Sequence, residues 1–303
     1  MNDLIRIFTD NLLPVFLASG SGFLLSKLLK INPRPISQAI LYIFAPSLLF
    51  TLLTNNDLNN NDILRSMLFI GFTILIVGAF AITISRIFRL NREFSSGLLL
   101  TSMFMNSGNY GLPVVLFAFG EAALGYASVY FVTMTIFTYT IGILIASMGT
   151  TDIKTSFINL LKLPTIYAVV IAFVLIYTGW EIPVFLDRTI TLLGDASIPS
   201  MLVLLGMQLA NVRLPGISLP LLLAVSIRLI ISPAVALLLT VIFGIFGPAR
   251  MALITIAGMP TAVFTTVLST EYDLNPSFVT AVVFTSTLLS PLSLTPILSL
   301  LGV

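Results

Sequence analysis

Apolar runs of about 20 residues or more recur along the whole chain, and each is long enough to cross a bilayer as an α-helix. Hydrophobic residues make up 57% of the 303 residues and charged residues 9%, whereas a soluble domain is about 25% charged. The strands of a transmembrane β-barrel would instead be short segments of alternating polarity. The sequence therefore predicts an all-α polytopic membrane protein in contact with a lipid bilayer.

Ten transmembrane helices are predicted, and the loops between them are too short for a soluble domain. The predicted spans, numbered 1 to 10, are 7–29, 36–54, 64–87, 94–119, 122–147, 163–179, 185–209, 217–246, 249–269 and 277–301. The N-terminal stretch Met1–Asp10 lacks the basic start of a cleaved signal peptide. We therefore expect the first span to be retained, with Asp10 at the membrane interface.

Lysine and arginine concentrate in the loops that follow the odd-numbered spans. Nine lie there and four lie on the opposite side. Since loops rich in positive charge stay in the cytoplasm, we expect both termini outside, in the plasma (cell inner) membrane. The nine are Lys27, Lys30, Arg34, Arg86, Arg89, Arg92, Lys154, Lys162 and Arg213.

Several classes of chemistry are excluded by what the chain lacks. It contains no cysteine and no histidine, which removes thiol catalysis, disulfides, histidine proton relays and most transition-metal sites. The net charge of +2 is too small to suggest nucleic-acid binding. We therefore expect no enzymatic activity, no cofactor and no metal site.

One predicted span is interrupted where an unbroken membrane helix would be expected. The stretch Met105–Val114 reads Met-Asn-Ser-Gly-Asn-Tyr-Gly-Leu-Pro-Val, with two amides, two glycines and a proline. Proline and glycine weaken a helix, and broken backbone at membrane depth must be buried in protein or line a wet cavity. The interruption is the first indication of a transport site.

A second interruption, Gly258–Ala262, lies five spans further on, and other motifs repeat at the same separation. Leu13-Pro14 matches Leu163-Pro164, and Ala45-Pro46-Ser47 matches Ile198-Pro199-Ser200. Because five is odd, the two halves must have opposite orientations in the membrane. The pattern predicts two inverted five-helix repeats, residues 1–150 and 151–303, with the site at the interrupted spans.

The segment Asn106-Ser107-Gly108-Asn109-Tyr110-Gly111-Leu112-Pro113 resembles the signature of the auxin efflux carrier family. That family includes plant PIN-type carriers and bacterial proteins described as malonate or other carboxylate transporters. Three further segments fit it: Leu13–Phe16, Ala45–Phe50 and Gly258–Ala262. The resemblance covers the whole chain. The short link at 149–162 departs from the long cytoplasmic loop of some plant members, and the substrate auxin does not carry over.

The resemblance implies a fold similar to that of the bile acid/sodium symporters. Spans 1, 2, 6 and 7 would form a scaffold, and spans 3–5 and 8–10 a moving transport bundle in which the broken spans 4 and 9 cross. Pro113 and Pro260 would then sit at the crossing, and Asn109 or Asn106 would contact substrate. A homodimer is also expected.

Half-helices that meet at a crossing present partly positive N-termini, which suit a carboxylate, and C-termini that suit a cation. Asn106 and Asn109 would add neutral donors, although they could instead satisfy only the interrupted backbone. Tyr110 is either a gate or a packing residue, and Thr261 is preferred over Thr265 and Thr266 as a site hydroxyl. The substrate-binding candidates are Asn106, Asn109, Tyr110, Gly111, Pro113, Gly258, Pro260 and Thr261.

Two charged residues, Asp195 and Arg228, lie about ten residues into their spans, near mid-depth. Asp195 is a candidate for proton or cation coupling and Arg228 for holding an anion. The alternatives are a static ion pair between them, or snorkelling to the interface. Gln208 and Asn211 either line an inward vestibule or meet water. Ser286, Thr287 and Ser290 either face the crossing or pack between helices.

The sequence favours a secondary transporter of small organic anions, mono- or dicarboxylates that are auxin- or malonate-like, working by elevator-type alternating access. A sodium- or proton-coupled symporter of another substrate and a transport-inactive membrane sensor remain alternatives. The predicted bundle spans contain no acid at depth, which weighs against a sodium site. Protons through Asp195, or the membrane potential alone, are the remaining driving forces.

Overall fold

The computed structural model describes the chain except for residues 1, 56–59, 148–157, 159–160, 211–215 and 217. The predicted boundary between the halves at 150/151 lies outside the described residues. So do Lys154, Asn211 and Arg213.

The described residues are helical throughout, apart from turns, short irregular segments and one isolated β-bridge. Seven of their helices are long and apolar enough to cross a membrane, which confirms the polytopic α-helical prediction. A shorter apolar helix spans Pro164–Thr178. The seven are Asp3–Leu29, Arg34–Thr54, Asn61–Ile87, Ser107–Ala146, Val184–Leu209, Leu219–Ile242 and Pro276–Leu300.

The difference between seven spans and the predicted ten has a physical origin in the interrupted segments. The predicted span 94–119 is divided after Met103, and the predicted span 249–269 is divided after Ala257. The helix after the first interruption continues into the next predicted span through a kink at Gly120, whose φ of 73° glycine adopts readily. The count of ten spans stays a prediction.

The α-helices and the π-helical turns (η) follow one another in this order. They are α1 Asn2–Ile7, η1 Phe8–Leu12, α2 Leu13–Leu29, α3 Arg34–Ala39, η2 Ile40–Phe44, α4 Ala45–Thr54, α5 Asn60–Ile87, α6 Arg92–Met103, η3 Ser107–Gly111, α7 Leu112–Phe137, η4 Thr138–Gly142, α8 Ile143–Ala146, α10 Pro164–Thr178, α11 Val184–Asp195, α12 Ser197–Leu209, α13 Leu219–Ser226, η5 Ile227–Ile231, α14 Ser232–Ile242, α15 Gly247–Ala257, α16 Phe264–Glu271 and α17 Pro276–Leu300.

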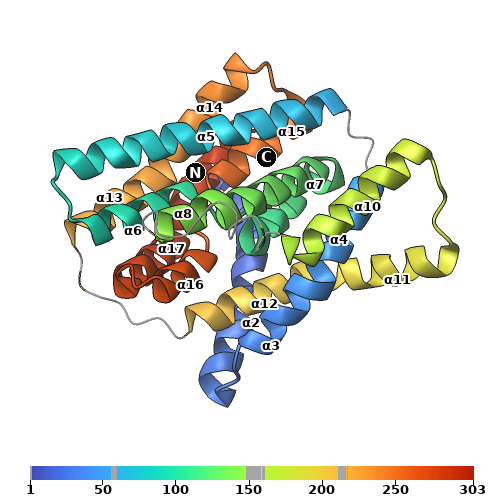
Figure 1. The fold of residues 1–303 in the computed structure, drawn as a ribbon, viewed down its shortest axis with the longest axis horizontal. Coiled ribbons are helices and arrows are strands. Elements are labelled where there is room, and N and C mark those ends of the chain that lie inside the picture. Colours follow the sequence, from blue (N-terminus) through green and yellow to red (C-terminus); the bar gives the residue numbers. More distant parts are fainter. Residues whose placement is uncertain (1, 56–59, 148–157, 159–160, 211–215, 217) are drawn as a thin grey trace.

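The contacts divide these helices into two groups. In the first group α2 packs against α12, while α10 and α11 pack against α4. In the second group α7 packs against α15, α5 contacts α6, α7 and α14, and α17 contacts α6, α13 and α16. In Figure 1, α5 crosses the top of the view, α2 and α12 lie toward the bottom, and α10 and α11 form the right-hand end.

Proline explains most of the π-helical turns. Four of the five described turns, η1, η2, η3 and η5, lead directly into a helix with proline in its first two positions. Proline has no N–H, and its ring clashes with the carbonyl group four residues earlier. In each case that carbonyl belongs to the π-helical turn, whose wider radius gives the ring room. The prolines are Pro14, Pro46, Pro113 and Pro233.

Glycine allows the closest helix contact in the first group, between α2 and α12. A Cβ atom built on Gly22 would lie 2.0 Å from the carbonyl oxygen of Val203. A Cβ atom on Gly206 would lie 1.7 Å from the carbonyl oxygen of Ser19. The two backbones therefore touch at positions where no side chain fits.

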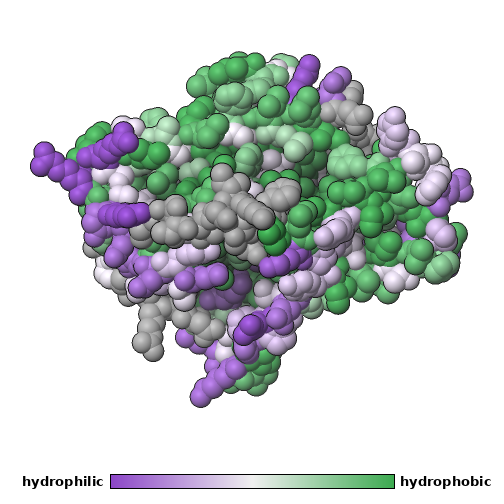
Figure 2. All heavy atoms as spheres, in the orientation of Figure 1, coloured by the Kyte–Doolittle hydropathy of each residue, from purple (hydrophilic) through white to green (hydrophobic). Residues whose placement is uncertain are grey.

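The surface of the molecule is broadly apolar, as a lipid-facing surface requires. Large apolar side chains stand exposed on separate helices, among them Leu75 at 60%, Tyr177 at 93% and Leu292 at 76% of their surface. Figure 2 shows wide apolar areas over much of the visible face. A soluble protein rarely exposes apolar patches of this extent, so these side chains are suited to contact with acyl chains.

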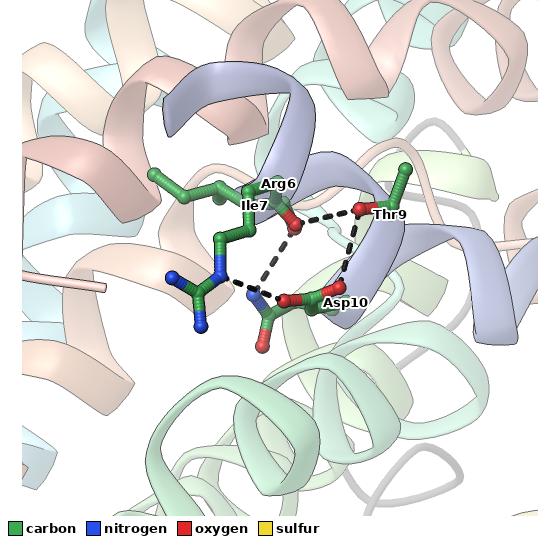
Figure 3. A network of polar contacts seen from close by, with 5 residues as sticks. Arg6, Ile7, Thr9 and Asp10 are labelled. Carbon is green, nitrogen blue, oxygen red and sulfur yellow. Dashed lines mark hydrogen bonds and ion pairs between the residues drawn. The ribbon is translucent and has the colours of Figure 1, made fainter. Parts of the chain in front are cut away.

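Polar contacts mark the N-terminal end of the first predicted span (Figure 3). The Arg6 guanidinium pairs with the Asp10 carboxylate at 3.4 Å, and the Thr9 hydroxyl donates to the Arg6 carbonyl at 3.0 Å. Arg6, Thr9 and Asp10 are exposed, which fits the interfacial position predicted for Asp10. Such an exposed pair contributes about 0–1 kcal/mol.

Candidate functional site

The two interrupted segments are joined by backbone hydrogen bonds. The Asn106 N–H donates to the Pro260 carbonyl at 2.8 Å, and the Ala262 N–H donates to the Phe104 carbonyl at 2.9 Å. Together these bonds form an antiparallel β-bridge between Met105 and Thr261. Backbone groups that lipid could not satisfy are thus satisfied by the other interruption.

Thr261 strengthens this junction and is fully buried. Its hydroxyl donates to the Thr101 carbonyl at 2.8 Å, near the end of α6. Its N–H donates to the Ser286 hydroxyl on α17 at 3.1 Å. Thr261 therefore connects the second interruption to two helices, α6 and α17, and lines neither cavity described below.

A cavity of about 340 Å³, here called the central cavity, lies between the two helix groups and against the first interruption. Its floor is formed by 105–109 from the first interruption and by 262–264, where the second interruption leads into α16. None of its described lining residues carries a charge. The remaining lining residues are Ser37, Ile40, Leu41, Ala45, Phe131, Met134, Thr135, Thr138, Tyr139, Thr165, Met201, Leu204, Gln208 and Val267.

Two helix beginnings border the central cavity. The turn η3 starts at Ser107, within the first interruption, and α16 starts at Phe264, two residues after the second ends at Ala262. Both residues line the cavity. The first amides of a helix have no acceptor within that helix and carry partial positive charge. The positive ends of two helix dipoles therefore border the floor, which has no cationic side chain among its described residues. Part of this donor capacity is already used, since the Ser107, Thr265 and Thr266 N–H groups donate to the Met105, Ala262 and Val263 carbonyls.

Asn106 and Asn109 both line the central cavity. Asn106 is 5% exposed, and its side-chain Nδ2 has no hydrogen-bond partner among the described residues. Its backbone is satisfied independently, because its carbonyl accepts from the Gly111 N–H at 2.9 Å. The side-chain amide of Asn106 is thus not needed to satisfy the backbone hydrogen bonds of the interruption. Asn109 is half-buried.

Comparison with known proteins shows the family of the chain. The family model described as "Membrane transport protein" matches the chain twice, over residues 7–156 and 150–298. The chain belongs to this family. The resemblance to the auxin efflux carriers is thereby confirmed.

Two curated relatives of this membrane transport protein are uncharacterized transporters from archaea. The one from Methanocaldococcus jannaschii is 29% identical over 270 residues, which cover 86% of each chain. The one from Methanothermobacter thermautotrophicus is 28% identical over 295 residues, which cover 94% of this chain and 96% of the relative. The chain is a membrane transporter of this family.

The other predicted site residues of the transporter lie next to the central cavity, not on its wall. Tyr110 is buried, its hydroxyl lies 2.9 Å from that of Ser290, and its ring packs edge-on against Phe16 with centroids 6.0 Å apart. It thereby joins the two helix groups. Gly111, Pro113, Gly258 and Pro260 are buried around the junction and do not line the cavity.

Several secondary candidates have defined positions as well. Ser286 and Ser290 face the junction through Thr261 and Tyr110. Thr287 instead donates to the Val283 carbonyl of its own helix at 2.7 Å. Gln208 lines the central cavity.

The structure does not bring Asp195 and Arg228 together. Asp195 is exposed and lines a second cavity of about 530 Å³ together with Glu121. Arg228 is fully buried, and its guanidinium donates to the Ser102 carbonyl, the Ser232 hydroxyl and the Ala257 carbonyl. Arg228 lines neither cavity.

Some residues of the site were not singled out from the sequence. Thr135, Thr138 and Tyr139 line the central cavity from α7 and η4. Their spacing of three and four residues places them on one helix face. This periodicity is visible in the sequence and could have indicated that they line the site. No local signal pointed to the partners of Arg228.

Proposed function

We propose that this transporter carries small organic anions, mono- or dicarboxylates that are auxin- or malonate-like, through the central cavity. The observation that carries the proposal is the cavity floor, where two helix N-termini and the unpartnered amide of Asn106 meet. These groups donate hydrogen bonds to a carboxylate without burying a permanent positive charge. The volume of about 340 Å³ is at the lower end of small-molecule sites, which span roughly 300–1,000 Å³.

We further propose elevator-type alternating access, in which the second helix group moves against the first. Both cavities lie between the two groups but at different depths. The central cavity is lined by residues within 40–45 and 201–208, whereas the second cavity is lined by residues within 48–52 and 194–202. Such a pair of cavities suits a substrate site that is alternately open to either side.

The proposed mechanism includes ten spans in two inverted repeats, with broken spans 4 and 9 crossing in the bundle. The twofold match of the family model, with its segments meeting at 150–156, supports two related halves. The hydrogen bonds between 104–106 and 260–262 support the crossing. In the orientation that positive loops predict, the central cavity opens to the cytoplasm, and the protein would form a homodimer in the plasma membrane.

Proton coupling is the second candidate, and the second cavity favours it. Asp195 and Glu121 are the acids on its wall. A carboxylate there could exchange a proton with the side opposite the central cavity. Export driven by the membrane potential alone needs neither acid, so Asp195→Asn separates the two mechanisms.

The test is uptake of labelled malonate and indole acetate into proteoliposomes, with imposed pH, sodium or voltage gradients. Asn106→Ala and Asn109→Ala are expected to raise KM at least tenfold, since each removes a donor from the anion. Asn11→Ala is the matched control, because this buried amide lies outside the central cavity and donates to the Ile7 carbonyl at 3.0 Å. Unchanged flux in both cavity variants would refute the proposed site.

A further inference from the structure

Arg228 is the largest fully buried side chain among the described residues, and no role in substrate binding accounts for it. It lies in the π-helical turn η5, between α13 and α14. Its guanidinium is separated from both cavities described above. A buried charge at membrane depth is costly and is retained where it has a function.

The guanidinium joins the ends of two short helices. Nη1 donates to the Ser102 carbonyl at 2.6 Å, one residue before α6 ends at Met103. Nη2 donates to the carbonyl of Ala257, the last residue of α15. The Ser232 hydroxyl accepts from the same guanidinium and donates to the Ala257 carbonyl at 2.9 Å.

Both helices end at the interruptions, where Arg228 donates to the Ser102 carbonyl and, together with Ser232, to the Ala257 carbonyl. The last four carbonyls of a helix lack partners within it, and each helix C-terminus is equivalent to roughly half a negative charge. Two such ends balance one guanidinium, which stays protonated in proteins. No carboxylate is among its hydrogen-bond partners in the described residues.

We infer that Arg228 is a tethered cation, which fills the place where two converging half-helix C-termini would otherwise hold a free monovalent cation. The inference rests on the proposed crossing of the broken spans. The junction is thereby divided: its helix N-termini face the substrate anion, and its helix C-termini are neutralised by the chain itself. Sodium therefore has no site at the C-terminal ends, and Arg228 is a positioning residue for the cavity floor.

The experiment compares the purified wild-type protein with Arg228→Lys, Arg228→Gln and Arg228→Ala in detergent. Thermal unfolding is followed in sodium, choline or guanidinium chloride at millimolar concentration and constant ionic strength. Arg228→Gln is expected to lower Tm by roughly 5–10 °C, and Arg228→Lys by less, because it keeps the charge. Guanidinium ion is expected to raise the Tm of Arg228→Ala. Arg188→Ala, which removes an exposed arginine of α11, is the matched control.

Three results would overturn the inference. The first is a Tm of Arg228→Gln equal to or above that of Arg228→Lys, which decides the matter even if Arg228→Ala does not fold. The second is a guanidinium effect on Arg228→Ala no larger than on Arg188→Ala. The third is a sodium-dependent rise in the Tm of the wild type that is absent from Arg228→Gln. If the variants show the expected Tm pattern but the wild-type protein transports no organic anion, only the proposed substrate class is refuted.

Discussion

A single methyl group added at Gly22 is expected to force α2 away from α12 and to destabilise the transporter. The Cβ atom of Gly22→Ala would lie 2.0 Å from the Val203 carbonyl oxygen and 2.9 Å from the Val203 Cα atom. Carbon and oxygen atoms normally approach no closer than about 3.3 Å. Because the opposing atoms are backbone, no side-chain rotation can relieve the overlap, and the helices must separate by about 1 Å.

Overpacking of this kind costs about 1–3 kcal/mol, and the better helix propensity of alanine returns up to about 1 kcal/mol. We therefore expect a net loss of roughly 1–2 kcal/mol, or about 2–8 °C in Tm. Gly20→Ala is the matched control, because it lies two residues away on α2 and its Cβ atom would meet nothing within 4 Å. Its Tm is expected to stay level or to rise.

The measurement is thermal unfolding of both variants in the same detergent. Gly206→Ala is expected to behave like Gly22→Ala, since its Cβ atom would lie 1.7 Å from the Ser19 carbonyl oxygen. The double variant is expected to cost less than the two single variants together, because one separation of the helices relieves both contacts. A Tm for Gly22→Ala equal to that of Gly20→Ala would show that the two backbones do not touch.

Three further predictions concern the junction and the cavities. Thr261→Val removes the hydroxyl bonded to the Thr101 carbonyl and is expected to cost about 1–2 kcal/mol in thermal unfolding, whereas Thr261→Ser is expected to retain most of that stability. Tyr110→Phe loses the hydrogen bond to Ser290 but no contact with the central cavity. Its Tm is therefore expected to fall by a few degrees while KM stays within twofold. A tenfold rise in KM would instead indicate that Tyr110 binds the substrate. Because the chain contains no cysteine, the single variants Gln208→Cys and Asp195→Cys report the accessibility of the central and the second cavity. A membrane-impermeant maleimide is expected to label the two variants from opposite sides of oriented vesicles. Labelling of both from one side would contradict the two-sided arrangement of the cavities.

The interruptions were predictable because their cause is local. Asparagine, glycine and proline within a few residues cannot form a regular helix, and the matching motif five spans later indicated a partner for Asn106–Pro113. Asn106 and Asn109, the predicted candidates that line the cavity floor, stood out for the same reason. The number of spans was harder to predict, since Gly120 joins two predicted spans into one kinked helix.

Contacts distant in sequence could not be predicted. The bond from Arg228 to the Ser102 carbonyl joins residues 126 positions apart, and the contact of Tyr110 with Ser290 joins residues 180 positions apart. Whether Tyr110 acts as a gate or as a packing residue depends on such a contact. Likewise, a buried arginine could equally pair with an acid, bind an anion or cap helices, and only the positions of its neighbours distinguish these roles.

The shared hydrogen bonds of the two interruptions also constrain how the protein is made. During synthesis the Phe104 carbonyl and the Asn106 N–H enter the membrane well before their partners Ala262 and Pro260 exist. Until then these groups must be hydrated or covered by the insertion machinery, because acyl chains cannot bond to them. Docking of the segment that contains Pro260 and Ala262 is therefore a late step of biogenesis. Nascent chains that end before residue 260 are expected to be degraded faster than full-length chains in a pulse-chase experiment, and equal lifetimes would contradict this order of assembly.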